Sequence, residues 1–467
     1  MGTVVPTEST MVDGVVGEVV VRFYEKIKDA NKVLALEQRC EAGENGNNMT
    51  LLQDLLGDPL SRVRHYPMYT MLVAEVNYEI VGVIRAGIKT LVCGMRQAES
   101  ITAGSRSTSS SRTEEGAAAP IYARAAYLLG LRVSPNHRRK GIGLKLASKM
   151  EEWCKEQGVE YIYFATTKDN EPSLKLFTQR LQYTPFRHPV LVGHPVWHHS
   201  VRLPSHIEVT KLSVEAAVAM YRSIMSTEEF FPEDIDKVLN HKLCAGTWVA
   251  ILREDRHWSS CCGGVTCRVG ENVGTIESSF VGDKDEDCRP RPKSWAVISL
   301  WKCNEIFTMQ LKGAPLHKRT GALLSRCVDK MLPWCKIPSF PDIFNPFGVQ
   351  FMFGLHAEGP RGPDLFRSLC RHAHNVSRKD GCQVLMTEVG ETDPLRPCIP
   401  RWGKFSSDDD VWCVKKLVQL GREVVTRRED SGSCRKIDVA SEHGSSYDWC
   451  QSSCPRGSTM FIDPRDV

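Results

Sequence analysis

Residues 128–153 read LLGLRVSPNHRRKGIGLKLASKMEEW, and this stretch decides the fold. An apolar run ends at Val133, and a short polar turn follows it. A helix is predicted over residues 141–157, because Ile142, Leu146, Met150 and Trp153 recur at helical spacing and form one apolar stripe. The stretch therefore predicts a strand, a basic turn with two glycines, and an amphipathic helix.

The turn has the chemistry of a phosphate cradle. Glycines at positions 141 and 143 let the backbone approach an anion closely, and the free N–H groups and dipole of the first helical turn favour negative charge. Arg139 and Lys140 add countercharge. The spacing differs from the Walker loop, which needs Gly-Lys followed by Ser or Thr, and from the three-glycine dinucleotide fingerprint. A pyrophosphate other than that of ATP or NAD is therefore favoured.

Outward from this stretch, strands and helices alternate with short connections, which indicates an α/β (α+β) fold with helices packed on a mixed sheet. Two β-rich runs around a tight turn at Asn77 predict a hairpin. Strands are predicted over residues 18–25, 69–76, 79–93, 125–133, 161–166 and 207–212, and helices over 31–40, 171–181 and 214–225.

Composition along the chain suggests two domains. We expect a flexible N-terminus over residues 1–17, a first domain over 18–204 and a second over 205–420, with the boundary near Pro204, and a flexible Ser- and Arg-rich tail over 421–467. Residues 94–119, rich in Ser, Thr, Gly and Ala, are expected to be a disordered loop inserted in the sheet. The second domain repeats the order of elements, so a weak internal duplication is plausible.

Composition also limits the class of protein. The 467 residues are 42% hydrophobic and 25% charged with a net charge of +4, which is typical of a globular protein and gives no basic field strong enough for direct nucleic-acid binding. No membrane-spanning run or signal peptide is recognised, so we expect the nucleus or cytoplasm. The 18 cysteines are therefore expected to be reduced thiols.

No metal site is expected. The histidines between residues 188 and 206 lack a regular ligand spacing, and Cys370 and His374 are a better pair that still resembles ordinary core and surface residues. In the second domain, residues 317–323 weakly echo the basic turn, but Leu323 stands where Gly143 stands in the first, so this half is expected to be a degenerate copy.

The Arg-x-x-Gly-x-Gly pattern of residues 138–143 resembles the signature of the GNAT superfamily of N-acyltransferases, and the order of elements from about residue 18 to 192 is similar to that fold. The chain also resembles the plant hookless-type probable N-acetyltransferases, through the segments 129–135, 229–232, 294–297 and 393–395. The resemblance implies a mostly antiparallel sheet flanked by helices, followed by a second, degenerate GNAT-like domain. It also implies acetyl-CoA as co-substrate, an amine of a protein (a histone among them) or of a small molecule as acceptor, and a role in plant growth and hormone response.

Residue by residue, the resemblance implies that the turn holds the cofactor pyrophosphate, that the end of the preceding strand holds the pantetheine arm, and that Asn170 and the helix after it flank the other side. Phe177 stands where many members carry a tyrosine that protonates the leaving thiolate, which leaves Tyr183, Tyr163 or water as the acid. Tyr127 stands near where some relatives keep a carboxylate base. The implied cofactor-binding residues are Leu131, Arg132, Val133, Arg138, Arg139, Lys140, Gly141, Ile142, Gly143, Asn170 and Phe177.

Two alternatives to an enzyme stay open at this point. One is a regulatory protein that binds acyl-CoA without turnover, because Phe177 cannot donate a proton and no obvious base is visible. The other is an interaction scaffold in which the second half does the work.

Overall fold

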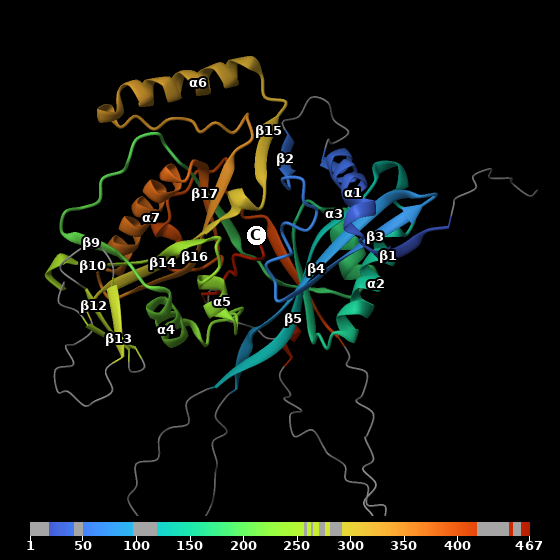
Figure 1. Ribbon diagram of the computed structural model, residues 1–467, viewed down its shortest axis with the longest axis horizontal. Helices are drawn as coiled ribbons and strands as arrows, with labels where there is room; N and C mark the ends of the chain where they lie inside the picture. The colour runs from blue at the N-terminus through green and yellow to red at the C-terminus, as the bar shows by residue number, and fades with distance from the viewer. Residues whose placement is uncertain are drawn as a thin grey trace, which may run out of the picture.

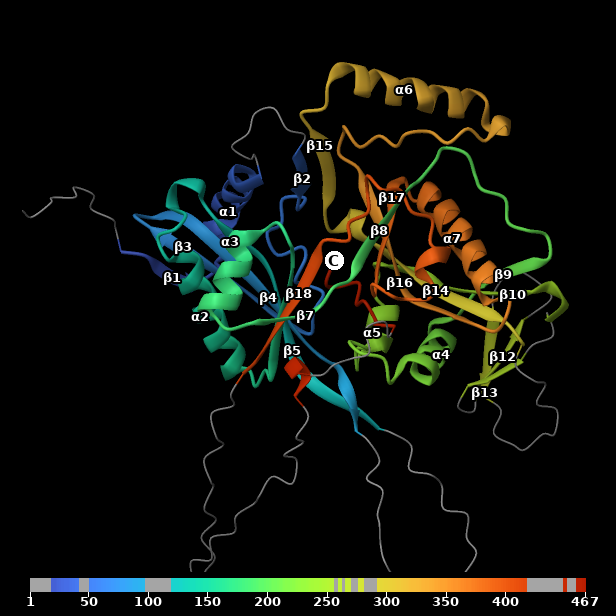
Figure 2. The same cartoon turned by 180° about the vertical axis from the view of Figure 1, so that it is seen from behind.

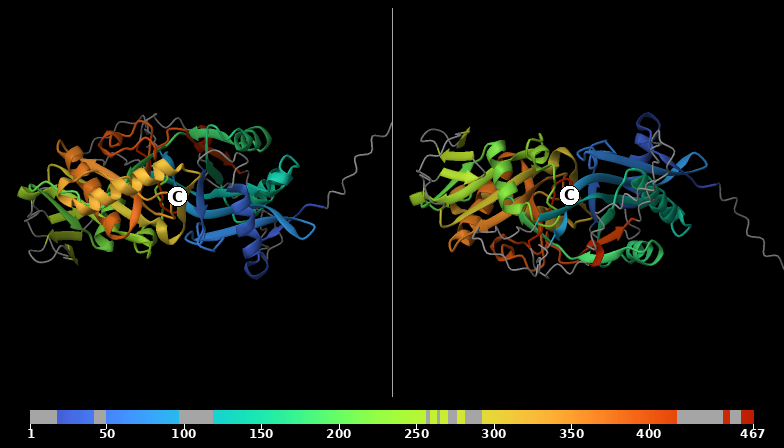
Figure 3. Two further views of the ribbon diagram at one scale, coloured as in Figure 1. Left: turned by 90° about the horizontal axis from the view of Figure 1, so that it is seen from above. Right: turned by 90° about the horizontal axis from the view of Figure 1, so that it is seen from below.

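The computed structural model describes residues 18–41, 50–96, 119–255, 259–262, 265–269, 276–280, 292–417, 448–451 and 459–467. Two large sheets lie side by side along the longest axis of the molecule, each with helices packed on it (Figure 1, Figure 3). We call them the first sheet and the second sheet. Both are mixed and mostly antiparallel, as predicted.

The first sheet has seven strands in the order β1-β3-β4-β5-β6-β18-β7, with β5 and β6 as its parallel pair. The predicted hairpin is confirmed: β3 and β4 pair across a turn in which Asn77 and Tyr78 both adopt positive φ. The strands are β1 (Val20–Phe23), β3 (Met68–Val76), β4 (Glu79–Arg96), β5 (Ala119–Val133), β6 (Tyr161–Thr167), β7 (Thr184–Arg187) and β18 (Asp410–Lys416).

Helices cover both faces of the first sheet. Helix α2 (Ile142–Glu156) buries Ile142, Leu146 and Met150 against one face, as its stripe predicts. Helix α1 (Lys26–Glu41) packs on the opposite face through Val33 and Leu36. The predicted helix at 171–181 is α3 (Glu171–Leu174), which continues as a π-helical segment, η2 (Lys175–Arg180).

The second sheet has six strands in the order β8-β17-β16-β14-β10-β9, again with one parallel pair, β16 and β17. Helix α7 (Gly362–Lys379) connects that pair as α2 connects β5 and β6, which is the arrangement that a duplication would produce. The strands are β8 (Val190–Pro195), β9 (Ile207–Lys211), β10 (Cys244–Leu252), β14 (Trp295–Lys302), β16 (Gly348–Glu358) and β17 (Cys382–Val389). Helices α4 (Val214–Met225) and α5 (Ile235–Leu239) pack on the face away from α7.

The two sheets exchange a strand each, which corrects the expected domain boundary. Strand β8 lies in the 18–204 segment but pairs with β17, and β18 lies in the 205–420 segment but pairs with β6 (Figure 2). Pro204 therefore does not divide the chain into one segment for each sheet. Composition could not reveal this, because the pairing partners are far apart in sequence.

The end of the chain is also part of the core, which corrects the expectation of a flexible tail for residues 459–467. Phe461, Ile462 and Asp463 are buried, and Met460 forms a β-bridge with Glu229. The described residues do not include the N-terminal segment 1–17, most of the tail or most of the 94–119 insert. At the start of the insert, Gly94–Arg96 belong to β4 and pair with β5.

A single hydrophobic cluster fills the space between the two sheets, and we call it the central cluster. It contains Tyr127, Tyr163 and Trp412 of the first sheet and Trp301 and Val384 of the second, together with Trp449 and Phe461. The halves are thus joined by a shared core.

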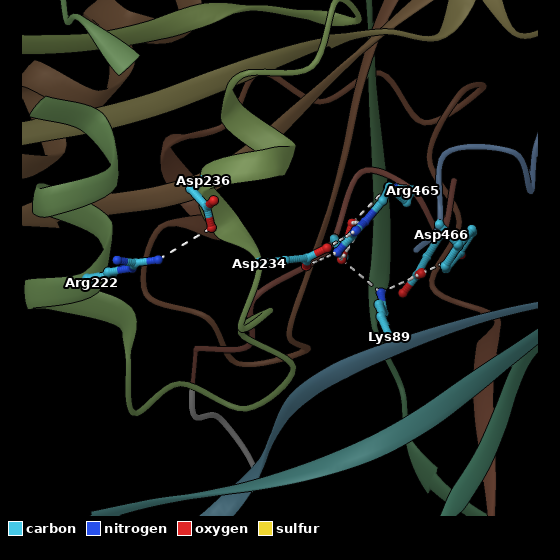
Figure 4. A network of polar contacts seen from close by, with 8 residues as sticks. Lys89, Arg222, Asp234, Asp236, Arg465 and Asp466 are labelled. Atoms are coloured by element: carbon cyan, nitrogen blue, oxygen red, sulfur yellow. Dashed lines mark hydrogen bonds and ion pairs between the residues drawn. The ribbon is translucent and has the colours of Figure 1, made fainter. Parts of the chain in front are cut away.

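Beside that core, the C-terminal segment carries a buried ion network (Figure 4). The Lys89 Nζ atom lies 2.6 Å from Asp466 and 3.0 Å from Asp463, and Arg465 bridges Asp463 to Asp234 at 2.7 and 2.8 Å. Burial opposes ionisation of Asp463, but Arg465 and Lys89 together hold its pKa below the ordinary value.

The remaining elements lie outside the two sheets. Helix α6 (Leu316–Met331) runs along the outer edge of the second half (Figure 1). It contains residues 317–323, so the expected echo of the basic turn is helix instead, and the counterpart of α2 is α7. The others are β2 (Thr50–Asp54), β11 (Ser259–Cys262), β12 (Val265–Val269), β13 (Ile276–Phe280), β15 (Thr308–Lys312), η1 (Pro135–His137), η3 (Arg253–Asp255), η4 (Cys303–Glu305), η5 (Pro333–Cys335), η6 (Arg396–Cys398) and η7 (Trp449–Gln451).

Candidate active site

The first sheet opens between β5 and β6. Residues Ala125–Leu128 of β5 pair with Tyr161–Phe164 of β6, and the two strands then separate. Beyond this point β5 pairs only with β4, and β6 pairs only with β18. Gly130 helps to turn β5 away, because its φ of 63° is left-handed and a Cβ there would lie 2.6 Å from the Arg85 guanidinium. The backbone of Leu131, Arg132 and Val133 thus has no strand partner on the β6 side.

The N-terminus of α2 lies next to this opening. Gly141 has a φ of 78°, and no side chain caps the helix, so the N–H groups of the first turn lack intrahelical partners. The basic side chains of Arg138, Arg139 and Lys140 are exposed around them. The Arg138 Nε atom donates to the Val133 carbonyl at 3.4 Å, which joins the turn to the end of β5. The geometry is that of an anion cradle.

Gly143 and Ile142 have different places at this helix start. A Cβ on Gly143 would lie 3.4 Å from Leu176 and 3.8 Å from Val133, so any longer side chain there would project into the space beside the opening. Ile142 is buried in the core under α2 and contributes its backbone N–H to the first turn.

Asn170 lies at the far side of the opening, at the start of α3. Its side chain accepts a hydrogen bond from the Ser173 N–H at 3.4 Å and donates one to Thr166 Oγ1 at 3.1 Å. Asn170 is exposed, and its two hydrogen bonds cap the start of α3 and join it to the end of β6.

Tyr127 and Tyr163 lie together on the face of the first sheet that meets the central cluster. Their ring centroids are 5.0 Å apart, and the Tyr163 hydroxyl donates to Asp466 at 2.8 Å. Burial raises the pKa of both phenols, and the nearby Asp466 carboxylate adds to the effect. Both groups therefore hold their protons and are poor bases at neutral pH.

Tyr183 and Phe177 lie on the opposite face, in the core under α2, which corrects their expected placement at the reacting centre. Phe177 is 2% exposed and packs 4.0 Å from the Phe164 ring and 5.1 Å from the Tyr183 ring. Tyr183 is 3% exposed, and burial raises its pKa. Their positions in sequence gave no sign of which sheet face they occupy.

Two carboxylates that the sequence analysis missed face the central cluster near Tyr127. Glu388 belongs to β17, and Asp410 is the first residue of β18. The period-2 alternation of these strands could have flagged both as inward-facing polar residues. Their approach to Tyr127 depends on long-range packing, which the sequence does not display.

The second half has no equivalent cradle. At the start of α7, the Arg361 N–H donates to Ser294 Oγ at 3.0 Å, and Pro363 has no N–H to offer. A Cβ on Gly359 would lie 1.9 Å from the Lys293 carbonyl, so the loop before α7 is closed by its own chain. Among the described residues, only the first half thus presents an open helix start between diverging parallel strands.

The polar residues considered as metal ligands have structural partners. His374 accepts a hydrogen bond from the Trp197 N–H at 2.9 Å, and His199 pairs with Asp329 at 2.7 Å. Within the described ranges, no group of three or more His, Cys, Asp or Glu side chains could hold a metal ion. No helix in those ranges is long and apolar enough to cross a membrane.

A sheet that opens between parallel strands onto an uncapped basic helix start defines the class of acyl-CoA-dependent acyltransferases with the GNAT fold. The chain matches the Acetyltransferase (GNAT) family over residues 36–183. It is 41% identical over 450 residues to "Probable N-acetyltransferase HLS1" of Arabidopsis thaliana, with 96% of this chain and 99% of the relative covered. It is 34% identical over 485 residues to "Acetyl transferase GW6a" of Oryza sativa subsp. japonica, with 96% and 97% covered.

Solved structures include similar folds at low identity. A tandem GNAT protein from the clavulanic acid biosynthesis pathway is 12% identical with a TM-score of 0.43, and 85% of this chain and 98% of that chain are covered. The chain belongs to the GNAT family of N-acetyltransferases, and it is an acyltransferase of a family that uses acetyl-CoA.

Proposed function

We propose that the protein transfers the acetyl group of acetyl-CoA to a primary amine of a protein, histones included, or of a small molecule. The observation that carries the proposal is the continuity of the open β5 edge with the uncapped start of α2. The first-turn N–H groups, with Arg138, Arg139 and Lys140, would bind the pyrophosphate. The free backbone of Leu131–Val133 would hydrogen-bond the pantetheine arm as an added strand.

The acceptor approaches from the second half in this proposal. Past Leu128, the β5–β6 opening exposes the thioester to the face that carries Tyr127 and Tyr163, and the second sheet faces it there. The protein's own residues must exclude water, accept a proton from the amine and donate hydrogen bonds to the carbonyl oxygen. The leaving thiolate takes up the proton that the attacking amine releases, through water, because Tyr183 is buried on the other face and burial keeps the Tyr163 phenol protonated.

We further propose that the protein acts in the nucleus or cytoplasm as a regulator of plant growth and hormone response. The support is the likeness to probable N-acetyltransferases of two plants over nearly the full chain. A fluorescent fusion expressed in plant cells tests the location, and exclusion from both compartments would reject it.

The enzymatic proposal is tested with the purified full chain, acetyl-CoA, and a panel of histone-tail peptides, polyamines and amino acids. Mass spectrometry of the acceptors and detection of released thiol measure transfer. We expect acetylation of at least one amine by the wild type and none by Gly143→Glu. If acetyl-CoA binds and no amine is acetylated, the protein is an acyl-CoA-binding regulator instead.

A further inference from the structure

Glu388 points from the second sheet toward the first. Along β17, Val384 and Met386 contact the central cluster, whereas Leu385 and Val389 belong to the core under α7. Alternation along the strand puts Glu388 on the side of Val384 and Met386. The carboxylate therefore faces the space between the two halves.

Asp410 reaches the same space from the first sheet. It is opposite Thr167 at the end of β6, beyond the point where β6 leaves β5. Trp412 and Val414, two and four residues on, both belong to the central cluster. Asp410 shares their side of the strand, so it lies where the opening meets the second half.

Neither carboxylate is neutralised by a partner. In the described part of the chain, the side chains of Glu388 and Asp410 have no hydrogen bond or ion pair, and both residues are half-buried. Glu228 and Asp393 line the same hollow as Glu388, and burial raises the pKa of both carboxyl groups. By contrast, Asp463 and Asp466 are already paired with Arg465 and Lys89.

Positive charge around the pair is limited. Arg62 is the cation that acts on Glu388, and Lys168 is the one that acts on Asp410, while Asp466 and Asp409 oppose them. Arg62 already donates to the Val467 backbone carbonyl at 3.3 Å. The space therefore favours an additional cation.

Tyr127 supplies a further polar group on this side of the opening. It is 6% exposed, it belongs to the central cluster, and its hydroxyl has no hydrogen-bond partner among the described residues. The charges of Glu388 and Asp410 both act on it and help to raise its pKa after burial and Asp466. The hydroxyl is therefore available to a polar group that binds beside it.

We propose that Glu388 and Asp410, with the Tyr127 hydroxyl, form the acceptor subsite: they bind a protonated primary alkylamine, and Glu388 accepts its proton. This inference rests on the proposed acetyl transfer. The ammonium gives one proton to the Glu388 carboxylate, and the amine nitrogen then attacks the thioester carbonyl. A C–N bond forms, the C–S bond breaks, the second amine proton leaves with the thiol product, and Glu388 returns its proton to water.

The electrostatics suit this task. Burial raises the pKa of Glu388 to about 8, with Asp410 and Asp466 adding to the effect, and burial raises the pKa of Asp410 to about 6. A base whose pKa is near the working pH combines a useful ionised fraction with a real affinity for the proton. The bound ammonium would itself favour ionised Glu388.

The test compares Glu388→Gln with wild type and with Glu391→Gln, an exposed neighbour just beyond β17. The probes are a lysine-containing peptide and n-butylamine with saturating acetyl-CoA. We expect kcat/KM to fall about 100-fold or more in Glu388→Gln, in line with the usual worth of general-base catalysis. The wild-type rate should rise with pH up to about 8, and this rise should vanish in the variant. Glu391→Gln should match the wild type.

Two further measurements distinguish a failure of the proposed acetyl transfer from a failure of the role proposed for Glu388. Calorimetry should show unchanged acetyl-CoA affinity in Glu388→Gln, and its Tm at pH 9 should exceed that of the wild type. The raised pKa makes the ionised form unfavourable in the fold, so the wild type loses stability as pH rises from about 4 through about 8. A wild type that acetylates neither probe and no amine in the wider panel overturns the proposed function. A Glu388→Gln variant that keeps the full rate and the pH limb overturns this inference alone.

Discussion

The Tyr183 ring packs in the core, whereas its hydroxyl makes no hydrogen bond of normal geometry with the described residues. The ring lies under α2, in contact with Phe164 and Phe177, and the buried hydroxyl lies near the Glu151 carboxyl. A buried donor without a partner costs about 1–3 kcal/mol. The residue is therefore a packing group and not the acid that protonates the thiolate.

Tyr183→Phe should keep the full acetylation rate and should leave the free energy of unfolding unchanged or raise it by about 1 kcal/mol. Urea denaturation and the peptide acetylation assay measure the two effects. The informative comparison is Tyr127→Phe, which removes a hydroxyl that faces the acceptor side. A tenfold or greater loss of kcat in Tyr183→Phe would return this tyrosine to the mechanism.

At the scale of elements, the C-terminal segment 459–467 connects the two halves, because its acidic residues bind Lys89 of β4 and its Arg465 binds Asp234. The Lys89 side chain is fully buried, and it contacts Asp463 and Asp466 at the same time. The Asp466 carboxylate also accepts hydrogen bonds from Tyr66 and Tyr163 at 2.7 and 2.8 Å. Removal of Lys89 would take away the ion pair of Asp466 and would leave Asp463 with Arg465 alone.

Lys89→Met should destabilise the protein by about 3–5 kcal/mol, the usual effect of breaking a buried ion pair from one side. Lys175→Met is the matched control, since it breaks an exposed pair with Glu171 and should leave the free energy of unfolding close to that of the wild type. Denaturant unfolding of both variants measures the difference. Equal free energies of unfolding for the two variants would mean that the buried ion network does not stabilise the fold.

Local signals were sufficient for some elements and not for others. The start of α2 and the β3–β4 hairpin were predictable, because glycines, a basic turn and alternating apolar residues act within a few positions. The exchange of β8 and β18 was not, because each pairs with a strand from the other half of the sequence. The cradle was therefore visible in the sequence, whereas the acceptor side, which is built from β17 and β18, was not.

At the scale of the whole molecule, the exchanged strands and the central cluster join two similarly built halves into one unit. If the chain is divided near Pro204, the first sheet loses an inner strand, β18, and the second sheet loses an edge strand, β8. In the proposed mechanism, the first half binds the cofactor at the start of α2, and the second half supplies Glu388 on the acceptor side.

The full chain should therefore unfold in a single calorimetric transition, and the segments 1–204 and 205–467 should each fail to fold when expressed alone. Scanning calorimetry of the full chain and circular dichroism of the segments test this. Two separate transitions, or a folded isolated first segment, would mean that the halves are independent domains.

We propose that one open cradle at the start of α2 binds acetyl-CoA, and titration calorimetry with acetyl-CoA is the direct test of this binding. We expect one molecule bound per wild-type chain and no measurable binding to Gly143→Glu, because the new carboxylate would occupy the anion site of a protein whose circular dichroism is unchanged. Gly321→Glu, at a helical glycine of α6 with open space around it, should bind as the wild type does. Unchanged affinity in Gly143→Glu, or two molecules bound per wild-type chain, would contradict the claim.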